Sequence, residues 1–143
     1  MQKIYIMKRA TSIGGIFFKC KDPQAQMDWY ATHLGIAMEQ YGSSFQWRQA
    51  DDKEKIGYTA WSAFKDNTDY FGNTSQQYMI NYRVDNLVAL VVQLKKEGIT
   101  VVDEIEEFEY GKFVHIVDLE GNRVELWEPN DEEYAKMVNA VTK

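Results

Sequence analysis

Two residues capable of acid–base chemistry, His115 and Glu125, lie in the most distinctive stretch of the sequence, YGKFVHIVDLEGNRVELWEP at 110–129. Alternating side chains predict two strands there, 113–117 and 123–127, joined by a tight turn at 119–122. One face of this hairpin would carry Phe113, His115, Val117, Arg123, Glu125 and Trp127. That face is too apolar for a solvent-exposed surface and too polar for a hydrophobic core. It therefore indicates one wall of a ligand cleft.

Glu125 is a candidate general acid or base, because a carboxylate among apolar neighbours can be tuned for proton transfer at neutral pH. The alternative is a structural carboxylate paired with Arg83 or Arg123, since a buried charge needs a partner. His115 is a candidate proton shuttle, with an ordinary pKa of about 6.5. Its alternative is a strand histidine that only hydrogen-bonds to a neighbour. The sequence leaves both pairs of interpretations open.

The first half of the chain predicts a strand, a helix and three further strands. The strand at 12–20 precedes a helix that Asp22 caps and Gly35 ends, with Pro23 at its first position. We expect a buried helix stripe of Ala25, Met27 or Asp28, Trp29 and Leu34. The three strands are expected at 36–40, 45–49 and 57–64, and a polar linker at 65–78.

The second half repeats this order. A strand at 78–84 is followed by a helix with Asp85 as its cap, and Gly98 ends this helix. Its predicted buried residues are Leu87, Leu90, Val91 and Leu94. A strand at 99–102, an acidic loop and the hairpin follow, and then a final helix over 130–143 that starts at Asn130. Residues 1–10 would form a short extra strand or a flexible lead.

Spacing supports an internal repeat, because Asp22 to Gly35 and Asp85 to Gly98 both span 13 residues. We therefore predict one α+β domain over 1–143, built from two tandem βαβββ modules at about 12–64 and 78–129. The modules would form a curved mixed sheet around a cleft, with helices outside and an extra C-terminal helix at 130–143.

The repeat, the stretch MINYRVDNLVALVVQLKKEGI at 79–99 and the hairpin segment DLEGNRVELWEP together resemble the vicinal oxygen chelate superfamily. This superfamily includes glyoxalase I, bleomycin-resistance proteins and extradiol dioxygenases, and the resemblance covers residues 12–129. It implies paired βαβββ modules around a cup-shaped cavity, usually in dimers. It does not fix one reaction, since members isomerise, cleave, transfer to or sequester their ligands.

The resemblance also implies four metal-ligand positions, and this chain keeps one of them. The two positions that open the modules fall on Gly15 and Met79, and the position that closes the first module falls within 59–63. Only Glu125 supplies a carboxylate, whereas a catalytic Zn²⁺ takes three protein ligands. We therefore expect no cofactor and no native divalent metal.

Six residues are predicted to contact a ligand: Phe17, Trp61, Asn81, Arg83, Phe113 and Trp127. Arg83 could hold an anionic or carbonyl group by paired hydrogen bonds, or form an ion pair with Glu125. The aromatic residues could stack on a planar ligand or simply fill a small cavity. Tyr70, Phe71 and Tyr110 could form the rim of the cleft or a dimer contact.

Composition narrows the class of partner. The chain has 143 residues, a formal net charge of -6 and one cysteine. The acidic balance argues against nucleic acid and anionic membranes, and no stretch reaches the roughly 20 apolar residues of a membrane helix. We expect a cytoplasmic homodimer that binds a small molecule, with modules that pair within one chain or swap between two.

Three functions follow from these observations. The leading one is metal-independent binding of a small, partly planar organic ligand in the cleft. The alternative is a lyase or isomerase that uses Glu125, with His115, for proton transfer on a carbonyl substrate. The third is a metal-dependent lyase of the glyoxalase type.

Overall fold

The structure, a computed structural model, describes residues 8–72 and 75–143. Most of the predicted N-terminal lead, including Ile4 and Ile6, lies outside these residues. In the described part, the elements follow one another as β1 (Ala10–Cys20), α1 (Pro23–Leu34), β2 (Gly42–Gln49), β3 (Asp52–Lys65), β4 (Tyr78–Val84), α2 (Leu87–Lys96), β5 (Glu106–Phe108), β6 (Gly111–Val117), β7 (Arg123–Pro129), α3 (Asp131–Met137) and β8 (Val141–Thr142).

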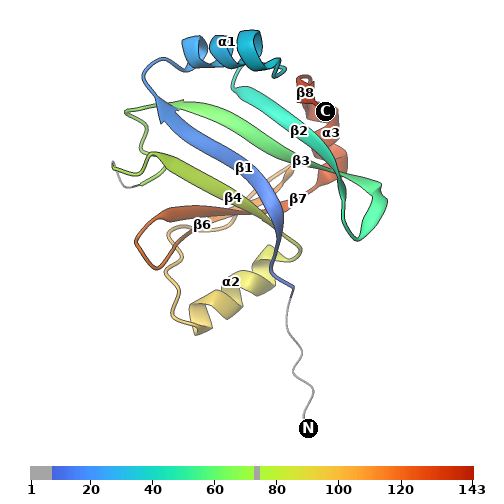
Figure 1. The fold of residues 1–143 in the computed structure, drawn as a ribbon. Coiled ribbons are helices and arrows are strands. Elements are labelled where there is room, and N and C mark those ends of the chain that lie inside the picture. Colours follow the sequence, from blue (N-terminus) through green and yellow to red (C-terminus); the bar gives the residue numbers. More distant parts are fainter. Residues whose placement is uncertain (1–7, 73–74) are drawn as a thin grey trace.

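All of these strands join in one curved sheet with the order β5-β6-β7-β4-β1-β3-β2-β8 (Figure 1). The opening strands of the two halves, β1 and β4, pair antiparallel at its centre. Each opening strand also pairs in parallel with the closing strand of its own half, β1 with β3 and β4 with β7. The α+β fold and its internal repeat are therefore confirmed. The two halves pair within this one chain.

Helix α1 begins and ends as predicted but packs differently. The Asp22 side chain accepts from the backbone N–H of Ala25, and Gly35 ends the helix with φ 67°. Of the expected stripe only Met27 is buried, whereas Trp29 is 52% and Leu34 61% exposed. Apart from Met27, the predicted buried stripe is wrong, because α1 lies at one end of the sheet, where it covers little of the strands (Figure 1).

Helix α2 covers the main apolar core. Its residues Leu87, Leu90, Val91 and Leu94 are buried, as predicted, against Val84, Val114 and Leu126 of the sheet. The helix cap was misplaced by one residue, since the Asn86 side chain accepts from the N–H of Ala89. Asp85 is exposed and lies near Lys8. No helix in the described residues is long and apolar enough to cross a membrane.

The strand predicted at 36–40 does not form, apart from an isolated bridge at Glu39. The strand position beside β2 is taken by β8, which pairs Val141 with Ser44. The final helix predicted over 130–143 is wrong for the same reason. It ends at Met137, and the Glu39 carboxylate accepts from the N–H groups of Asn139 and Ala140 as the chain turns into β8.

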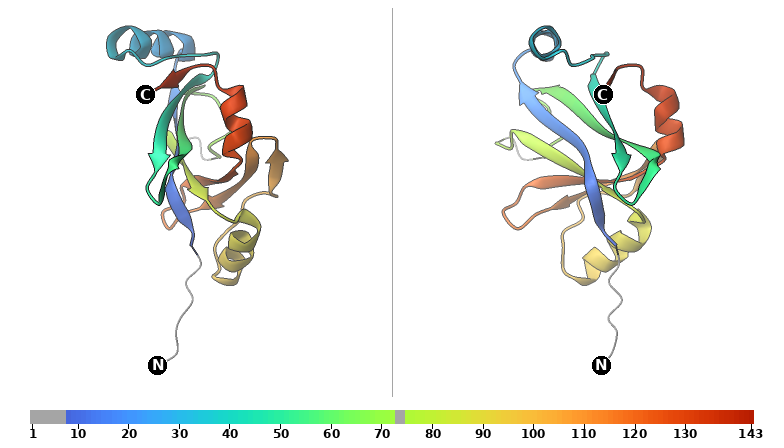
Figure 2. Two further views of the ribbon diagram at one scale, coloured as in Figure 1. Left: turned by 90° about the vertical axis from the view of Figure 1, so that its right-hand side faces the viewer. Right: turned by 45° about the vertical axis from the view of Figure 1, so that its right-hand side comes forward.

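In the second half, the strand predicted at 99–102 is likewise reduced to a single bridge between Val101 and Ile116. The edge strand β5 forms instead within the acidic stretch, where Glu106 pairs with Phe113. The third helix, α3, lies apart from α1 and α2 (Figure 2). Its Tyr134 packs against Tyr58 and Trp127 on the concave side of the sheet, so this helix is not on the outside.

Candidate ligand cavity and its buried carboxylate

Glu125, in the middle of β7, is 1% exposed and faces the concave side of the sheet. Strand register places Asn81 on one side of it and His115 on the other. Asn81 Nδ2 donates to Oε1 at 2.7 Å, and the Tyr70 hydroxyl donates to Oε2. His115 Nε2 lies 2.8 Å from Oε2, as an ion pair rather than an aligned hydrogen bond. The partners of Glu125 are thus Asn, Tyr and His, and the predicted pairing with Arg83 or Arg123 is wrong.

His115 connects this carboxylate to the acidic loop. Its Nδ1 lies 2.7 Å from Asp103 Oδ2, and its backbone N–H donates to Asp103 Oδ1 at 2.8 Å. Burial lowers the pKa of His115, but its close contacts with Glu125 and Asp103 and their negative charges outweigh this effect, so the net shift is upward. Glu125, His115 and Asp103 form a chain that ends at a side chain 35% exposed. A titratable imidazole thus lies between the buried carboxylate and a carboxylate that reaches solvent.

Tyr70 reaches the site from the segment that was predicted as a linker. Its ring stacks on Phe64, with centroids 5.5 Å apart, and the fully buried Phe71 anchors the next position. Burial and the charge of Glu125 raise the pKa of Tyr70 well above its ordinary value, so the hydroxyl keeps its proton and donates. A sequence pattern gives no sign of this contact, because it depends on the path of an irregular segment.

A cavity of about 230 Å³ opens beside Glu125. Its walls are mainly aromatic, and they include four of the six predicted ligand residues, Phe17, Asn81, Phe113 and Trp127. The full lining is Gly14, Phe17, Ala60, Ser62, Phe64, Tyr70, Asn81, Tyr110, Phe113, Glu125, Trp127 and Tyr134. Phe113 and Trp127 stack on each other, with their rings 9° from parallel and their centroids 5.6 Å apart. The contact of these residues with a ligand stays a prediction.

Gly14 lets the sheet close around Asn81. The pairing of β1 with β4 shifts register between Ile13 and Gly15, which brings Gly14 to the cavity. A Cβ at Gly14 would overlap Asn81 Oδ1 and lie 2.9 Å from Arg83 Cγ. Glycine is therefore required there for Asn81 to reach Glu125.

Trp61 is not at the cavity, and its predicted role there is wrong. Ala60, Ser62 and Phe64 of β3 line the cavity, so strand alternation turns Trp61 to the opposite face. Its ring packs against Phe18 and Tyr30 beneath α1, at centroid distances of 4.9 and 5.0 Å. The sequence located the closing strand of the first half correctly but misjudged which alternate residues face inward.

Arg83 is also committed elsewhere. It is 4% exposed, forms an ion pair with Asp131 and donates to the backbone oxygen of Tyr58. Its guanidinium lies over the rings of Trp47 and Trp127, 5.0 and 5.3 Å from their centroids. These contacts satisfy the group and hold it outside the cavity lining. The predicted pairing of Arg83 with Glu125 is therefore wrong, and its contact with a ligand stays a prediction.

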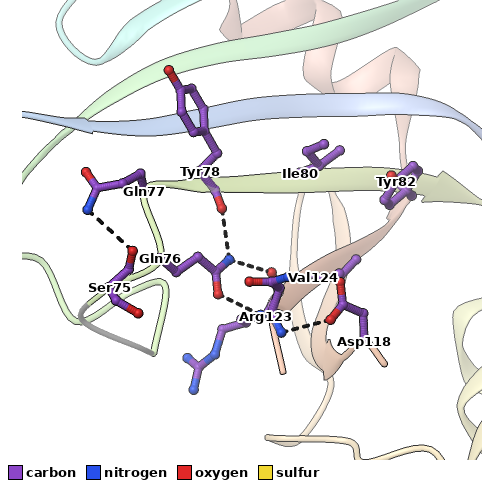
Figure 3. Close-up of a pocket in the computed structure, with 10 residues that line it drawn as sticks. Ser75, Gln76, Gln77, Tyr78, Ile80, Tyr82, Asp118, Arg123 and Val124 are labelled. Atoms are coloured by element: carbon purple, nitrogen blue, oxygen red, sulfur yellow. Dashed lines mark hydrogen bonds between the residues drawn. The ribbon is translucent and has the colours of Figure 1, made fainter. Parts of the chain in front are cut away.

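A second cavity, of about 370 Å³, lies near the starts of β4 and β7 (Figure 3). Gln76 is buried there, and its amide joins the two strands. Its Nε2 donates to the backbone oxygens of Tyr78 and Arg123, and its Oε1 accepts from the N–H of Arg123. Because these bonds already satisfy the amide, we interpret this hollow as structural.

Comparison with known proteins identifies the fold but not the function. No protein family model and no curated protein sequence matches the chain. Solved structures do match: a variant of methylmalonyl-CoA epimerase from Streptomyces coelicolor, in complex with 2-nitronate-propionyl-CoA, has a TM-score of 0.65 at 14% identity over 85% of this chain and 99% of that one. The Mycobacterium tuberculosis epimerase gives 0.59 at 16% identity, over 92% and 97%.

These epimerases belong to the vicinal oxygen chelate superfamily. The chain has the vicinal oxygen chelate fold. A further match of this kind, a Legionella pneumophila protein named as an NAD-dependent benzaldehyde dehydrogenase, has a TM-score of 0.52 at 11% identity, over 81% and 98% of the two chains. Because the names of similar structures differ and their identities are low, the vicinal oxygen chelate fold alone does not assign a reaction here.

Two of the four metal positions that the resemblance implies, Met79 and Gly15, hold groups that do not suit such a metal. Met79 is 1% exposed and packs with Phe17 and Phe71 in an apolar cluster. Gly15 has no side chain, and a Cβ added there would lie 2.8 Å from the Phe17 ring. Within residues 8–72 and 75–143, no three His, Cys, Asp or Glu residues gather where they could hold an ion. The residues present therefore do not fit a metal of the glyoxalase type.

Proposed function

We propose that this protein binds a small, partly planar organic molecule in the cavity beside Glu125, without a metal. The observation that carries the proposal is a cavity of about 230 Å³ with seven aromatic residues in its lining and one buried carboxylate at its wall. Ligand sites are typically apolar hollows with a few well-placed polar groups. Phe113, Trp127 and the other aromatic side chains of the lining suit a planar ring of a ligand.

Independence from a metal is supported by the partners of Glu125. Both of its oxygens already contact donors, since Asn81 binds Oε1, and Tyr70 and His115 contact Oε2. A carboxylate held in this way is oriented before any ligand arrives. It can then accept a hydrogen bond from the ligand, or form an ion pair with a cationic group of the ligand, without rearrangement.

A cavity-filling variant tests this proposal. A set of small planar compounds would be screened by ligand-observed NMR against the wild type and Ser62→Trp, which fills the cavity from β3. Lys53→Trp, at an exposed position of the same strand, is the matched control. We expect compounds that bind the wild type and the control but not Ser62→Trp, with circular dichroism confirming that all three fold. Equal binding to Ser62→Trp would place the ligands elsewhere and overturn the proposal.

A second candidate function is proton transfer at a carbon next to a carbonyl group, as in an isomerase. The chain from Glu125 through His115 to Asp103 favours it, because it offers a route by which a proton can return to solvent. The epimerases of similar fold are consistent with this chemistry. Exchange of the α-hydrogen of a bound carbonyl compound for solvent deuterium would support it, provided that Glu125→Gln abolishes the exchange. Binding without exchange would leave the sequestering function.

A further inference from the structure

We infer that the ligand of this cavity is an organic monocation, a protonated or quaternary amine carried on a flat or apolar body. This inference rests on the proposed function, since it names the chemical class that the same cavity would take.

The charged groups in and near the cavity lining favour a cationic ligand. Glu125 lies at the wall, and among the described residues that line the cavity none is Lys, Arg or His. The cations nearby are occupied with other groups. Arg83 pairs with Asp131 between two tryptophan rings, and Lys19 lies over the Phe71 ring. His115 sits between Glu125 and Asp103, so even its full positive charge leaves these three groups with a net negative charge.

The aromatic walls of the cavity also favour a cationic ligand. The Tyr70 hydroxyl donates a hydrogen bond to Glu125, and the Tyr70 ring lines the cavity. The rings of Phe17, Phe113 and Trp127 line it too. The faces of such rings carry partial negative charge and attract ammonium groups, most strongly where water is excluded. An anion would instead meet ring faces and a carboxylate with no partner for its charge.

The rim adds negative charge. A neighbouring hollow of about 200 Å³ shares Tyr70, Tyr110 and Phe113 with the cavity, and Asp103 and Glu106 also line it. Burial raises the pKa of both tyrosine hydroxyls, and the charges of Glu125 and Glu106 raise them further. Both hydroxyls thus lie in the negative potential of Glu125 at the cavity wall and Glu106 at the rim.

Three fragments of similar size test the inference: benzylammonium, benzyl alcohol and benzoate, titrated into the full chain by calorimetry at pH 7.5. We expect benzylammonium to bind at least about tenfold more tightly than benzyl alcohol, and benzoate more weakly than both. Glu125→Gln should weaken the binding of benzylammonium about tenfold and change the Kd of benzyl alcohol less than about threefold. Glu54→Gln removes the same charge at an exposed site away from the cavity and should change neither.

Each outcome separates this inference from the function it rests on. If benzyl alcohol or benzoate binds as tightly as benzylammonium, the cation inference is overturned while the ligand cavity stands. If none of the three binds, both are overturned. If Glu125→Gln does not fold, Glu106→Gln at the rim replaces it, and an unchanged preference for benzylammonium in that variant would contradict the contribution of the rim.

Discussion

Glu125 is fixed by donors from three separate segments before any ligand binds. Asn81 comes from the neighbouring strand, His115 from the hairpin partner and Tyr70 from the segment after β3. A carboxylate is costly to bury without such partners. Glu125 is 1% exposed, lies beside a cavity and is held by three polar partners, and for these reasons we place the function here.

Gly14→Ala tests how tightly this arrangement is built. The added Cβ overlaps Asn81 Oδ1, so Asn81 must move away from Glu125. We expect a loss of about 1–3 kcal/mol in the free energy of unfolding, measured by urea denaturation. Gly35→Ala and Gly98→Ala are poor controls because their φ values are positive, whereas Ser12→Ala changes β1 without entering the cavity lining. A Gly14→Ala variant as stable as Ser12→Ala would contradict the close approach.

Asp103→Asn tests the link between His115 and the acidic loop. Asp103 helps to raise the pKa of His115, so the variant should lower that pKa, as followed by NMR titration of the two histidines. A pKa raised by folding adds stability below the unfolded-state pKa of about 6.5, and this stability is lost as pH rises through the folded-state value. The variant should therefore lose more stability relative to wild type at pH 5.5 than at pH 9. An equal loss at both pH values would show that His115 is not the coupled group.

Asp131→Asn addresses the ion pair that keeps Arg83 out of the cavity. The variant leaves a guanidinium that is 4% exposed without its carboxylate. We expect a cost of about 3 kcal/mol in the free energy of unfolding, because an unpaired buried charge is strongly destabilising. Glu132→Gln, one residue along α3, removes a charge that makes no such pair and should cost less than about 0.5 kcal/mol. Similar values for both variants would mean that Arg83 relies on its aromatic neighbours instead.

At the scale of elements, the two halves match closely but complete their edges differently. In the second half the outer strand, β5, comes from the same half, whereas in the first half it is β8 from the end of the chain. The strand expected at 36–40 is displaced because β8 occupies the edge of β2. The C-terminal segment is thereby built into the sheet, and α3 is drawn over the cavity through Tyr134.

At the start of α2, two adjacent residues could each cap the helix, and a sequence pattern does not distinguish between them. Asn86 caps the helix by accepting from the N–H of Ala89, while Asp85 points to solvent. Asn86→Ala should cost about 1 kcal/mol in thermal or urea unfolding, and Asp85→Ala less than about 0.5 kcal/mol. The reverse order would restore the cap that the sequence favoured.

How far the sequence predicted the site follows from what periodicity can and cannot encode. Strand alternation placed His115, Glu125 and Asn81 on one face, because register within regular strands is local information. It misassigned Trp61 by one position, since the boundaries of the closing strand were uncertain. It could not place Tyr70 beside Glu125 or Asp103 beside His115, because both come from irregular segments whose paths depend on tertiary packing.

In the part of the chain that the structure describes, one curved sheet carries α1 and α2 on its outer side and α3 over its concave side, next to an aromatic cavity. A homodimer stays a prediction, and so do a cytoplasmic location and the absence of a cofactor. The fold explains why a cavity lies here, because both halves turn the same face of their central strands toward it. The side chains of this chain, rather than the fold, determine what the cavity can bind.

The central claim, that the Glu125 cavity is the ligand site, is tested most directly by the indole N–H signals of the four tryptophans. Benzyl alcohol, which is neutral, would be titrated while these signals are followed by two-dimensional NMR. We expect a saturable shift of the Trp127 signal, since Trp127 lines the cavity, and little change in the signals of Trp61 beneath α1 and the exposed Trp29. Saturable binding that moves Trp61 or Trp29 and leaves Trp127 unchanged would contradict it.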